Sequence, residues 1–173
     1  SLIILVGFFL RAWNVENISL WLDEFFTTYK IYHAKYTDFL TYFFSFQPDQ
    51  VPISHIIYYA FYNLFPSWFA NVDNLRWISV LIGTLNIFLI YYLGRSTFSE
   101  RVGLFSALLF AISPYHTLFA QMIRPYIFME FFSLISLLAT AKLIKNISPT
   151  NLLFWIFANV LLLLSHFMTI LLI

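Results

Sequence analysis

The sequence has 173 residues, of which 61% are hydrophobic, 22% are aromatic and 10% are charged. Soluble domains carry roughly a quarter of charged residues, so this composition excludes an ordinary soluble domain and indicates an integral membrane protein. The net charge of +1 gives no indication of a nucleic-acid partner, and the absence of cysteine excludes disulfide and thiolate chemistry.

The chain begins without Met inside one apolar run and ends inside another, which indicates a fragment truncated at both ends. Its first apolar run lacks the basic flank and the small-residue cleavage site of a signal peptide. Residues 1–13 are therefore expected to form part of a first membrane span.

Residues 14–74 form a long segment in which polar and aromatic residues are mixed. Within it, apolar residues recur at helical spacing over residues 24–36, 38–46 and 53–65. Runs this short are more often interfacial than spanning. All three are predicted to be juxtamembrane helices that lie along the membrane surface.

Four later apolar runs are each long enough, at about 20 residues, to cross a bilayer. They cover residues 75–94, 102–120, 125–142 and 152–173. The predicted fold class is therefore all-α: a polytopic transmembrane helical bundle that forms one domain over residues 1–173.

Basic residues mark two of the turns between these spans. One turn carries Arg95 and Arg101, and the other carries Lys142 and Lys145. Because positive charge is enriched on the cytoplasmic side of membrane proteins, both turns are predicted to be cytoplasmic. Residues 14–74 then form an outward loop.

On this topology, the polar residues that could carry chemistry converge at the outward face. Charges beside apolar surface are costly unless they pair or line a cavity, so their convergence predicts a functional site there. The residues of this layer are Arg11, Asp23, Glu24, Gln50, His55, Arg76, His116, Gln121, Arg124, Tyr126 and His166.

Two adjacent carboxylates, Asp23 and Glu24, follow Trp21 at the start of a predicted helix. A structural explanation is sufficient for both: one caps the helix and the other interacts with its positive end. The functional alternative is that Asp23 acts as a general base or helps to bind a cation.

Three arginines of the outward layer also have two interpretations. Arg124, Arg76 and Arg11 could extend to the interface as long cationic side chains do, or they could bind a phosphate through the planar guanidinium group. His166 lies within the last predicted span, where a lone His faces a protein interior or a cavity more often than lipid. A metal role for His166 has no second ligand close in sequence, so no metal ligand is assigned.

Several short motifs occur together in a characteristic order. They are Arg11, then Ser19 to Glu24, Pro52, Asn74 to Ser79, Tyr92 to Arg95, Arg101 to Leu104, Ala111 to Pro114, and Gln121 to Tyr126. In this order and spacing they resemble the N-terminal part of the membrane glycosyltransferases related to dolichyl-phosphate-mannose–protein mannosyltransferases, the glycosyltransferase family 39-like enzymes of GT-C type.

The resemblance implies many spans and a large first outward loop with juxtamembrane helices and an Asp-Glu pair. It implies that Asp23 is the catalytic acid, with Glu24 beside it. It also implies that Arg124 lies near a lipid phosphate and that His166 has an aromatic setting. The other expected substrate-binding residues are Arg11, Arg76, Tyr126 and Gln121.

The chain departs from the family pattern at two places. Many relatives have His-Pro-Pro where this chain has Gln50, Val51 and Pro52, and many have an acid where this chain has Met122. The cofactor therefore stays open, with a divalent cation as one option.

The expected function is transfer of a hexose or pentose from a polyprenyl-phosphate carrier to an acceptor hydroxyl, with inversion at the anomeric carbon. The acceptor could be a protein, a lipid or a polysaccharide. A transporter or flippase for a lipid-linked sugar and a catalytically silent membrane scaffold are the alternatives. The expected location is a multi-pass membrane protein with its site on the non-cytoplasmic face, in the plasma membrane of a bacterium or the endoplasmic reticulum of a eukaryote.

Overall fold

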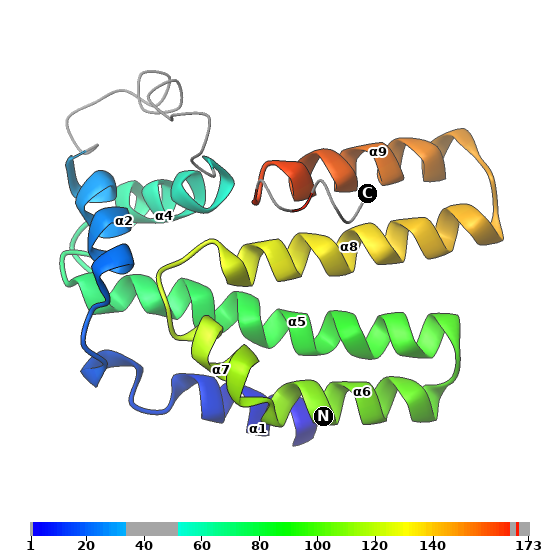
Figure 1. The fold of residues 1–173 in the computed structure, drawn as a ribbon, viewed down its shortest axis with the longest axis horizontal. Coiled ribbons are helices and arrows are strands. Elements are labelled where there is room, and N and C mark those ends of the chain that lie inside the picture. Colours follow the sequence, from blue (N-terminus) through cyan, green and yellow to red (C-terminus); the bar gives the residue numbers. More distant parts are fainter. Residues whose placement is uncertain (1, 34–51, 167–168, 170–173) are drawn as a thin grey trace.

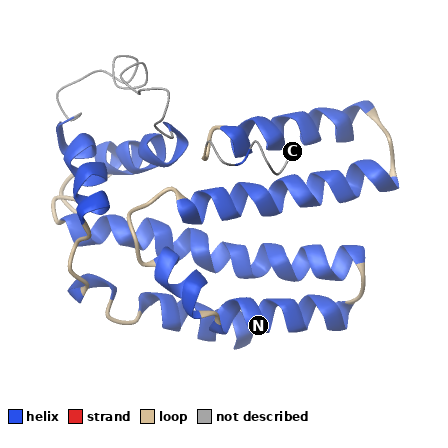
Figure 2. Cartoon of the chain, in the orientation of Figure 1, coloured by secondary structure: helices blue, strands red, loops and turns tan. Residues whose placement is uncertain are grey.

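A computed structural model describes residues 2–33, 52–166 and 169 of the chain. The ordered elements in this part are helices, and no strand occurs among the described residues (Figure 2). The predicted all-α fold class is thereby confirmed. The predicted helix over residues 38–46, and Gln50, lie outside the described residues.

Long helices that lie side by side form the body of the molecule (Figure 1). The helix α5 (Arg76–Thr97) lies between α6 (Glu100–Ile112) and α8 (Tyr126–Lys145), and α9 (Pro149–Leu163) packs on the other side of α8. The first helix, α1 (Leu2–Ala12), packs against both α5 and α6. Short turns make α5 antiparallel to α6 and α8 antiparallel to α9, whereas α5 and α8 run parallel and end at the same side of the bundle.

The predicted span over residues 102–120 is broken in the structure. The helix α6 ends at Ile112, and α7 (Pro114–Ala120) continues at an angle of 64°. Proline has no N–H to donate and drives the preceding residue out of the helical region, and Ser113 is accordingly extended, with φ −66° and ψ 122°. The break directs the chain after α7 back toward the start of α5.

A second bend, of 81°, separates α1 and its following turn from α2 (Leu22–His33). The helix α2 crosses one end of the bundle, where α4 (Pro52–Leu64) packs against it (Figure 1). Short 3-10 turns at Val15–Asn17 and Val72–Leu75 complete this end. In the last predicted span, over residues 152–173, α9 ends at Leu163, and residues 167–168 and 170–173 lie outside the described residues.

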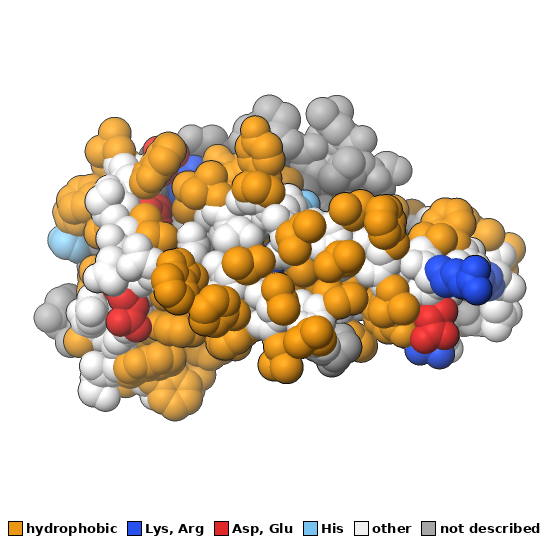
Figure 3. Space-filling view, turned by 90° about the horizontal axis from the view of Figure 1, so that it is seen from below, with side chains coloured by type: hydrophobic (Ala, Val, Ile, Leu, Met, Phe, Trp, Pro, Cys, Tyr) orange, Lys and Arg blue, Asp and Glu red, His pale blue; other side chains and the backbone are white. Residues whose placement is uncertain are grey.

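Two stretches are long and apolar enough to cross a membrane by themselves: Val72–Thr97 and Tyr126–Lys145. The number rises to as many as four if each bent pair is one span, and α9 is a shorter apolar helix. Figure 3 shows a mainly apolar face with charged side chains toward its ends. An apolar surface of this kind is what a lipid environment favours, and the protein is a membrane protein.

Close backbone packing joins α5 to α6 at the end opposite α2. A Cβ atom added at Gly103 would lie 2.6 Å from the backbone oxygen of Tyr91, and one added at Gly94 would lie 2.8 Å from the Cα of Gly103. Real Cβ atoms do not approach backbone this closely, so glycine is required at both positions for the hairpin to close. At the same end Lys145 donates to the backbone oxygen of Ser96, which joins the two basic turns.

Candidate active site

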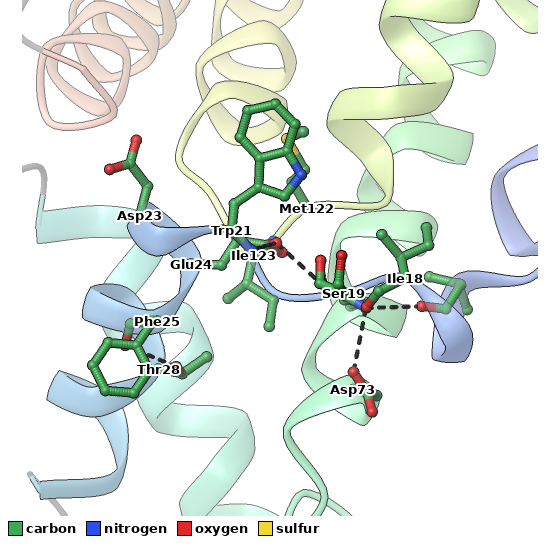
Figure 4. Close-up of polar contacts among 12 residues, drawn as sticks. Ile18, Ser19, Trp21, Asp23, Glu24, Phe25, Thr28, Asp73, Met122 and Ile123 are labelled. Atoms are coloured by element: carbon green, nitrogen blue, oxygen red, sulfur yellow. Dashed lines mark hydrogen bonds and ion pairs between the residues drawn. The ribbon is translucent and has the colours of Figure 1, made fainter.

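Glu24 is buried at the start of α2 and is held by three groups from different parts of the chain. Its Oε1 accepts a hydrogen bond from the Ile123 N–H at 2.8 Å. Its Oε2 accepts from the Trp21 N–H at 3.1 Å and pairs with Arg76 Nη2 at 3.3 Å. Figure 4 shows this cluster between α2, α5 and the loop after α7. Because both carboxylate oxygens are engaged and the side chain is only 1% exposed, Glu24 fixes the positions of these three segments.

Arg76 completes the cluster from the first turn of α5, where its side chain is fully buried. In addition to Glu24, its guanidinium pairs with Asp73 Oδ1 at 3.2 Å and donates to the backbone oxygens of Val15 at 3.1 Å and Ile18 at 2.6 Å. Val15 and Ile18 lie on the turn that leads into α2. Arg76 therefore anchors this turn to α5, and both of its Nη atoms contact protein groups.

Asp23 has a different environment, although it is adjacent to Glu24 in sequence. Its side chain is 64% exposed and points away from the Glu24 cluster (Figure 4). Its Oδ2 pairs with Arg124 Nη2 at 3.3 Å, and Arg124 Nη1 donates to the Asp23 backbone oxygen at 3.3 Å. An accessible carboxylate and a guanidinium thus meet at the outer surface of this end of the bundle.

The loop that carries Arg124, over residues 121–125, is held on several sides. Gln121 donates to the backbone oxygens of Arg11 and Trp13 at 3.0 and 2.9 Å. Ser79 donates to the Met122 oxygen at 2.7 Å. Together with the bond from Ile123 to Glu24, these contacts fix the backbone on which the Arg124 side chain is mounted.

Two aromatic rings border Arg124. Its Cζ atom lies 5.5 Å from the centroid of the Tyr126 ring, which is within the range of a cation–π contact. The Tyr126 and His166 rings have centroids 5.9 Å apart. Burial, and then the Arg124 cation, lower the pKa of His166. His166 lies beyond the last residue of α9, and a neutral imidazole beside Arg124 avoids repulsion between two cations.

Arg11 lies away from this group, inside the bundle. It is fully buried and donates to the backbone oxygens of Gly7 at 3.0 Å, Ala111 at 3.1 Å and Phe110 at 3.1 Å. Ala111 and Phe110 end α6 at the break before Pro114, where helix carbonyls lack intrahelical partners. In the structure Arg11 satisfies these carbonyls.

The predicted outward layer is therefore divided into distinct groups. Asp23, Arg124, Tyr126 and His166 lie together at the surface, while Glu24 and Arg76 lie beneath them and Arg11 lies deeper. His55 accompanies Ser54, with its Nδ1 3.4 Å from the Ser54 Oγ.

One ion pair was not anticipated from the sequence. His116 Nδ1 on α7 lies 3.0 Å from Glu130 Oε2 on α8. Their separation of 14 residues includes the loop over residues 121–125, so helical spacing could not have predicted it. The pair ties α7 to α8.

Within the described parts of the chain, no three His, Asp or Glu side chains gather as potential metal ligands.

A family model described as dolichyl-phosphate-mannose-protein mannosyltransferase matches residues 47–173. The resemblance identified in the sequence is thereby confirmed. Neither the curated proteins nor the solved structures gave a match to the chain. The matched range contains Arg76 and Arg124 and begins after Asp23 and Glu24, which are joined to it by the ion pairs described above.

Proposed function

The chain belongs to the dolichyl-phosphate-mannose-protein mannosyltransferase family, and we propose on that basis that it moves a sugar from a polyprenyl-phosphate carrier to an acceptor hydroxyl at the non-cytoplasmic membrane face. Membership implies a glycosyltransferase activity in a membrane protein. Beyond family membership, we propose the carrier, the direction of transfer and the roles of individual residues.

The observation that carries the proposal is the pairing of an exposed carboxylate with a guanidinium, Asp23 with Arg124, at 3.3 Å. A transfer reaction of this kind needs a base for the acceptor and a cation for the departing phosphate. Asp23 is accessible and Glu24 is not. We therefore assign the base to Asp23 and a positioning role to Glu24.

In the proposed reaction the acceptor hydroxyl gives its proton to the Asp23 carboxylate. The acceptor oxygen forms a bond to the anomeric carbon while the bond from that carbon to the phosphate oxygen breaks, and the phosphate leaves with the electron pair. Arg124 offsets the negative charge that gathers on the phosphate, which is where fixed cationic groups lower a barrier most. Attack opposite the leaving group inverts the anomeric centre, by the logic of inverting glycosidases.

The sugar has to lie between the base and the phosphate, so the pair must separate when the donor binds. Asp23 and Arg124 are 3.3 Å apart in the structure, which leaves no room for a sugar between them. The Arg124 side chain is long enough to turn from Asp23 to a phosphate, and Tyr126 offers it a ring to lie against. In the structure the ion pair neutralises both groups.

The proposed orientation rests on the two basic turns. Arg95, Arg101, Lys142 and Lys145 gather at the end of the bundle away from Asp23, and a hydrogen bond from Lys145 joins the two turns. Because basic turns favour the cytoplasm, we place Asp23 and Arg124 on the opposite side. A carrier phosphate at that interface would reach Arg124 while its polyprenyl tail lies among the spans.

Replacement of Asp23 by Asn tests the base. Asn keeps the shape of the side chain but cannot take a proton, so the full-length Asp23→Asn protein should insert normally and lose transfer by about 10²-fold or more. The assay measures the transfer of label from a polyprenyl-phosphate sugar by the reconstituted protein, with a membrane lipid fraction as the source of acceptor. Glu100→Gln, which removes an acid at the far end of the bundle, serves as the matched control. Near-normal turnover in Asp23→Asn, or movement of the labelled lipid across the membrane without transfer, would contradict the proposal.

Replacement of Arg124 by Lys tests the phosphate contact separately. Lys keeps the positive charge but cannot make the two parallel bonds of a guanidinium. Transfer should fall, and the apparent affinity for the donor should weaken. An unchanged apparent affinity for the donor in Arg124→Lys would show that Arg124 does not bind the phosphate.

A further inference from the structure

The end of the bundle opposite Asp23 has two hollows along the contact between α5 and α8. The first has a volume of about 200 Å³ and is lined by Tyr92, Ser96, Leu138, Ala141, Lys142 and Lys145. Two lysines, a serine and a tyrosine thus line one small space. Its chemistry suits an anion with several oxygens.

The second hollow has a volume of about 350 Å³ and shares Ala141 and Lys145 with the first. Its other walls are mainly apolar, with Leu93, Phe98, Leu137 and Ile144 among them. Phe98 and Ile144 are 76% and 78% exposed, so their apolar surface is left for lipid. A polar space and an apolar groove therefore adjoin at Lys145.

The charges at this end are strongly unbalanced. Arg95, Arg101, Lys142 and Lys145 stand against the single acid Glu100 in the two turns and the helix ends that they join. Two helix C-termini, of α5 and α8, and two N-termini, of α6 and α9, meet here. Their dipoles oppose one another, so the side chains set the potential, and it is positive.

The two lysines that line the polar hollow are also placed by contacts with neighbouring helices. Lys142 Nζ lies 5.3 Å from the centroid of the Phe154 ring on α9. Lys145 donates to the Ser96 oxygen in the last turn of α5. Neither lysine has a carboxylate partner among the described residues, so an external anion would not compete with an acid of the protein.

We propose that these two hollows bind one anionic glycerophospholipid of the cytoplasmic leaflet. Its phosphate lies between Lys142 and Lys145, and one acyl chain lies in the groove beside Leu137 and Ile144. Basic hollows between spans on the cytoplasmic side suit anionic headgroups. The choice of leaflet rests on the orientation given under the proposed function, whereas the binding itself does not. The bound lipid would hold the α5 and α8 ends together and stabilise the bundle from the side opposite the site of transfer.

The test measures which lipid the full-length protein retains. The protein is placed in nanodiscs of dioleoyl phosphatidylcholine with a minor fraction of dioleoyl phosphatidylglycerol, extracted, and its bound lipids are measured by mass spectrometry. A basic side chain near a phospholipid contributes about 1 kcal/mol, which is about fivefold in affinity. Wild-type protein should be enriched in phosphatidylglycerol, and Lys142→Gln with Lys145→Gln should reduce that enrichment by about 25-fold.

The matched control removes two charges from the same end without touching either hollow. Arg95→Gln with Arg101→Gln should keep most of the enrichment, because these arginines line neither space. Equal loss in both double variants would reveal a diffuse field in place of a site and would overturn the proposal, as would wild-type protein without enrichment.

A second measurement tests the lipid site even if the variant with both lysines replaced by Gln fails to fold. The thermal midpoint of the wild-type protein should rise when phosphatidylglycerol is added to phosphatidylcholine, and Lys142→Arg with Lys145→Arg should preserve that rise. An unchanged wild-type midpoint would count against the site. Because no sugar donor is present in these experiments, their failure would leave the assignment of Asp23 intact, and loss of the Asp23 assignment would leave the lipid site intact.

Discussion

Replacement of Glu24 by Gln should destabilise the outer end of the bundle strongly. Glu24 and Arg76 are 1% and 0% exposed and lie 3.3 Å apart. Gln keeps the size of the side chain but has one acceptor oxygen for three donors: the N–H groups of Ile123 and Trp21 and the Arg76 guanidinium. Its amide nitrogen would point a further donor at groups that already donate.

The magnitude follows from the charge that is left behind. Loss of one partner from a buried ion pair costs about 3–5 kcal/mol because the other charge stays buried without compensation. Arg76 keeps Asp73 at 3.2 Å and its backbone acceptors, so the lower value, about 3 kcal/mol, applies. For a chain of this size that corresponds to about 6–12 °C in thermal midpoint.

The assay is the thermal midpoint of the detergent-solubilised full-length protein, followed by the loss of its monodisperse size-exclusion peak. Glu16→Gln is the control, since Glu16 accepts an exposed hydrogen bond from Trp77 Nε1 at 3.1 Å that Gln can also accept. The double variant Glu24→Gln with Arg76→Gln should be more stable than the sum of the single variants predicts, because residues in one ion pair are coupled. A Glu24→Gln midpoint equal to that of Glu16→Gln, or strict additivity in the double variant, would refute the reasoning.

Two further predictions concern other parts of the bundle. Gly103→Ala would place a Cβ 2.6 Å from the Tyr91 backbone oxygen, so it should lower the free energy of unfolding by about 1–3 kcal/mol. The control Ser106→Ala, on the same helix, should leave the thermal midpoint nearly unchanged. Equal midpoints for the two variants would show that the α5–α6 hairpin can open without cost. Burial raises the pKa of Tyr32 to about 12, against about 10 in an unfolded chain, so its contribution to stability is complete below pH 10 and declines between about pH 10 and 12. Tyr32→Phe, which also loses the bond to the Phe69 oxygen, should show a weaker decline over that range in thermal midpoints measured against pH, and an identical decline would contradict this assignment.

The sequence alone was sufficient for the fold class and for the family. Apolar runs of membrane length and a shortage of charge dictate helices in lipid, because a bilayer leaves no partner for an unpaired backbone group. Runs with helical spacing likewise predicted the helices now seen as α2 and α4. The motifs from Asn74 to Tyr126 carried a family resemblance that the family match confirms.

The helix break at Pro114 could not be predicted from hydropathy. Residues 102–120 are apolar on average, so their mean hydropathy predicts one span. Proline ends the helix at Ile112 all the same, and the carbonyls that it leaves are satisfied by Arg11, about 100 residues earlier in the chain. The proline is visible in the sequence, but the partner that makes the break stable is not.

The two adjacent acids at the start of α2 also separate what the sequence determines from what the tertiary structure decides. The sequence determined that Asp23 and Glu24 open a helix, and since successive residues of a helix point about 100° apart, only one of them could face the bundle. The tertiary structure decided which one: Glu24 faces Arg76 and Ile123, which lie 52 and 99 residues further along the chain, and Asp23 is left at the surface beside Arg124. No local pattern encodes that choice, because it depends on how α2 crosses α5 and on where the loop after the broken helix returns.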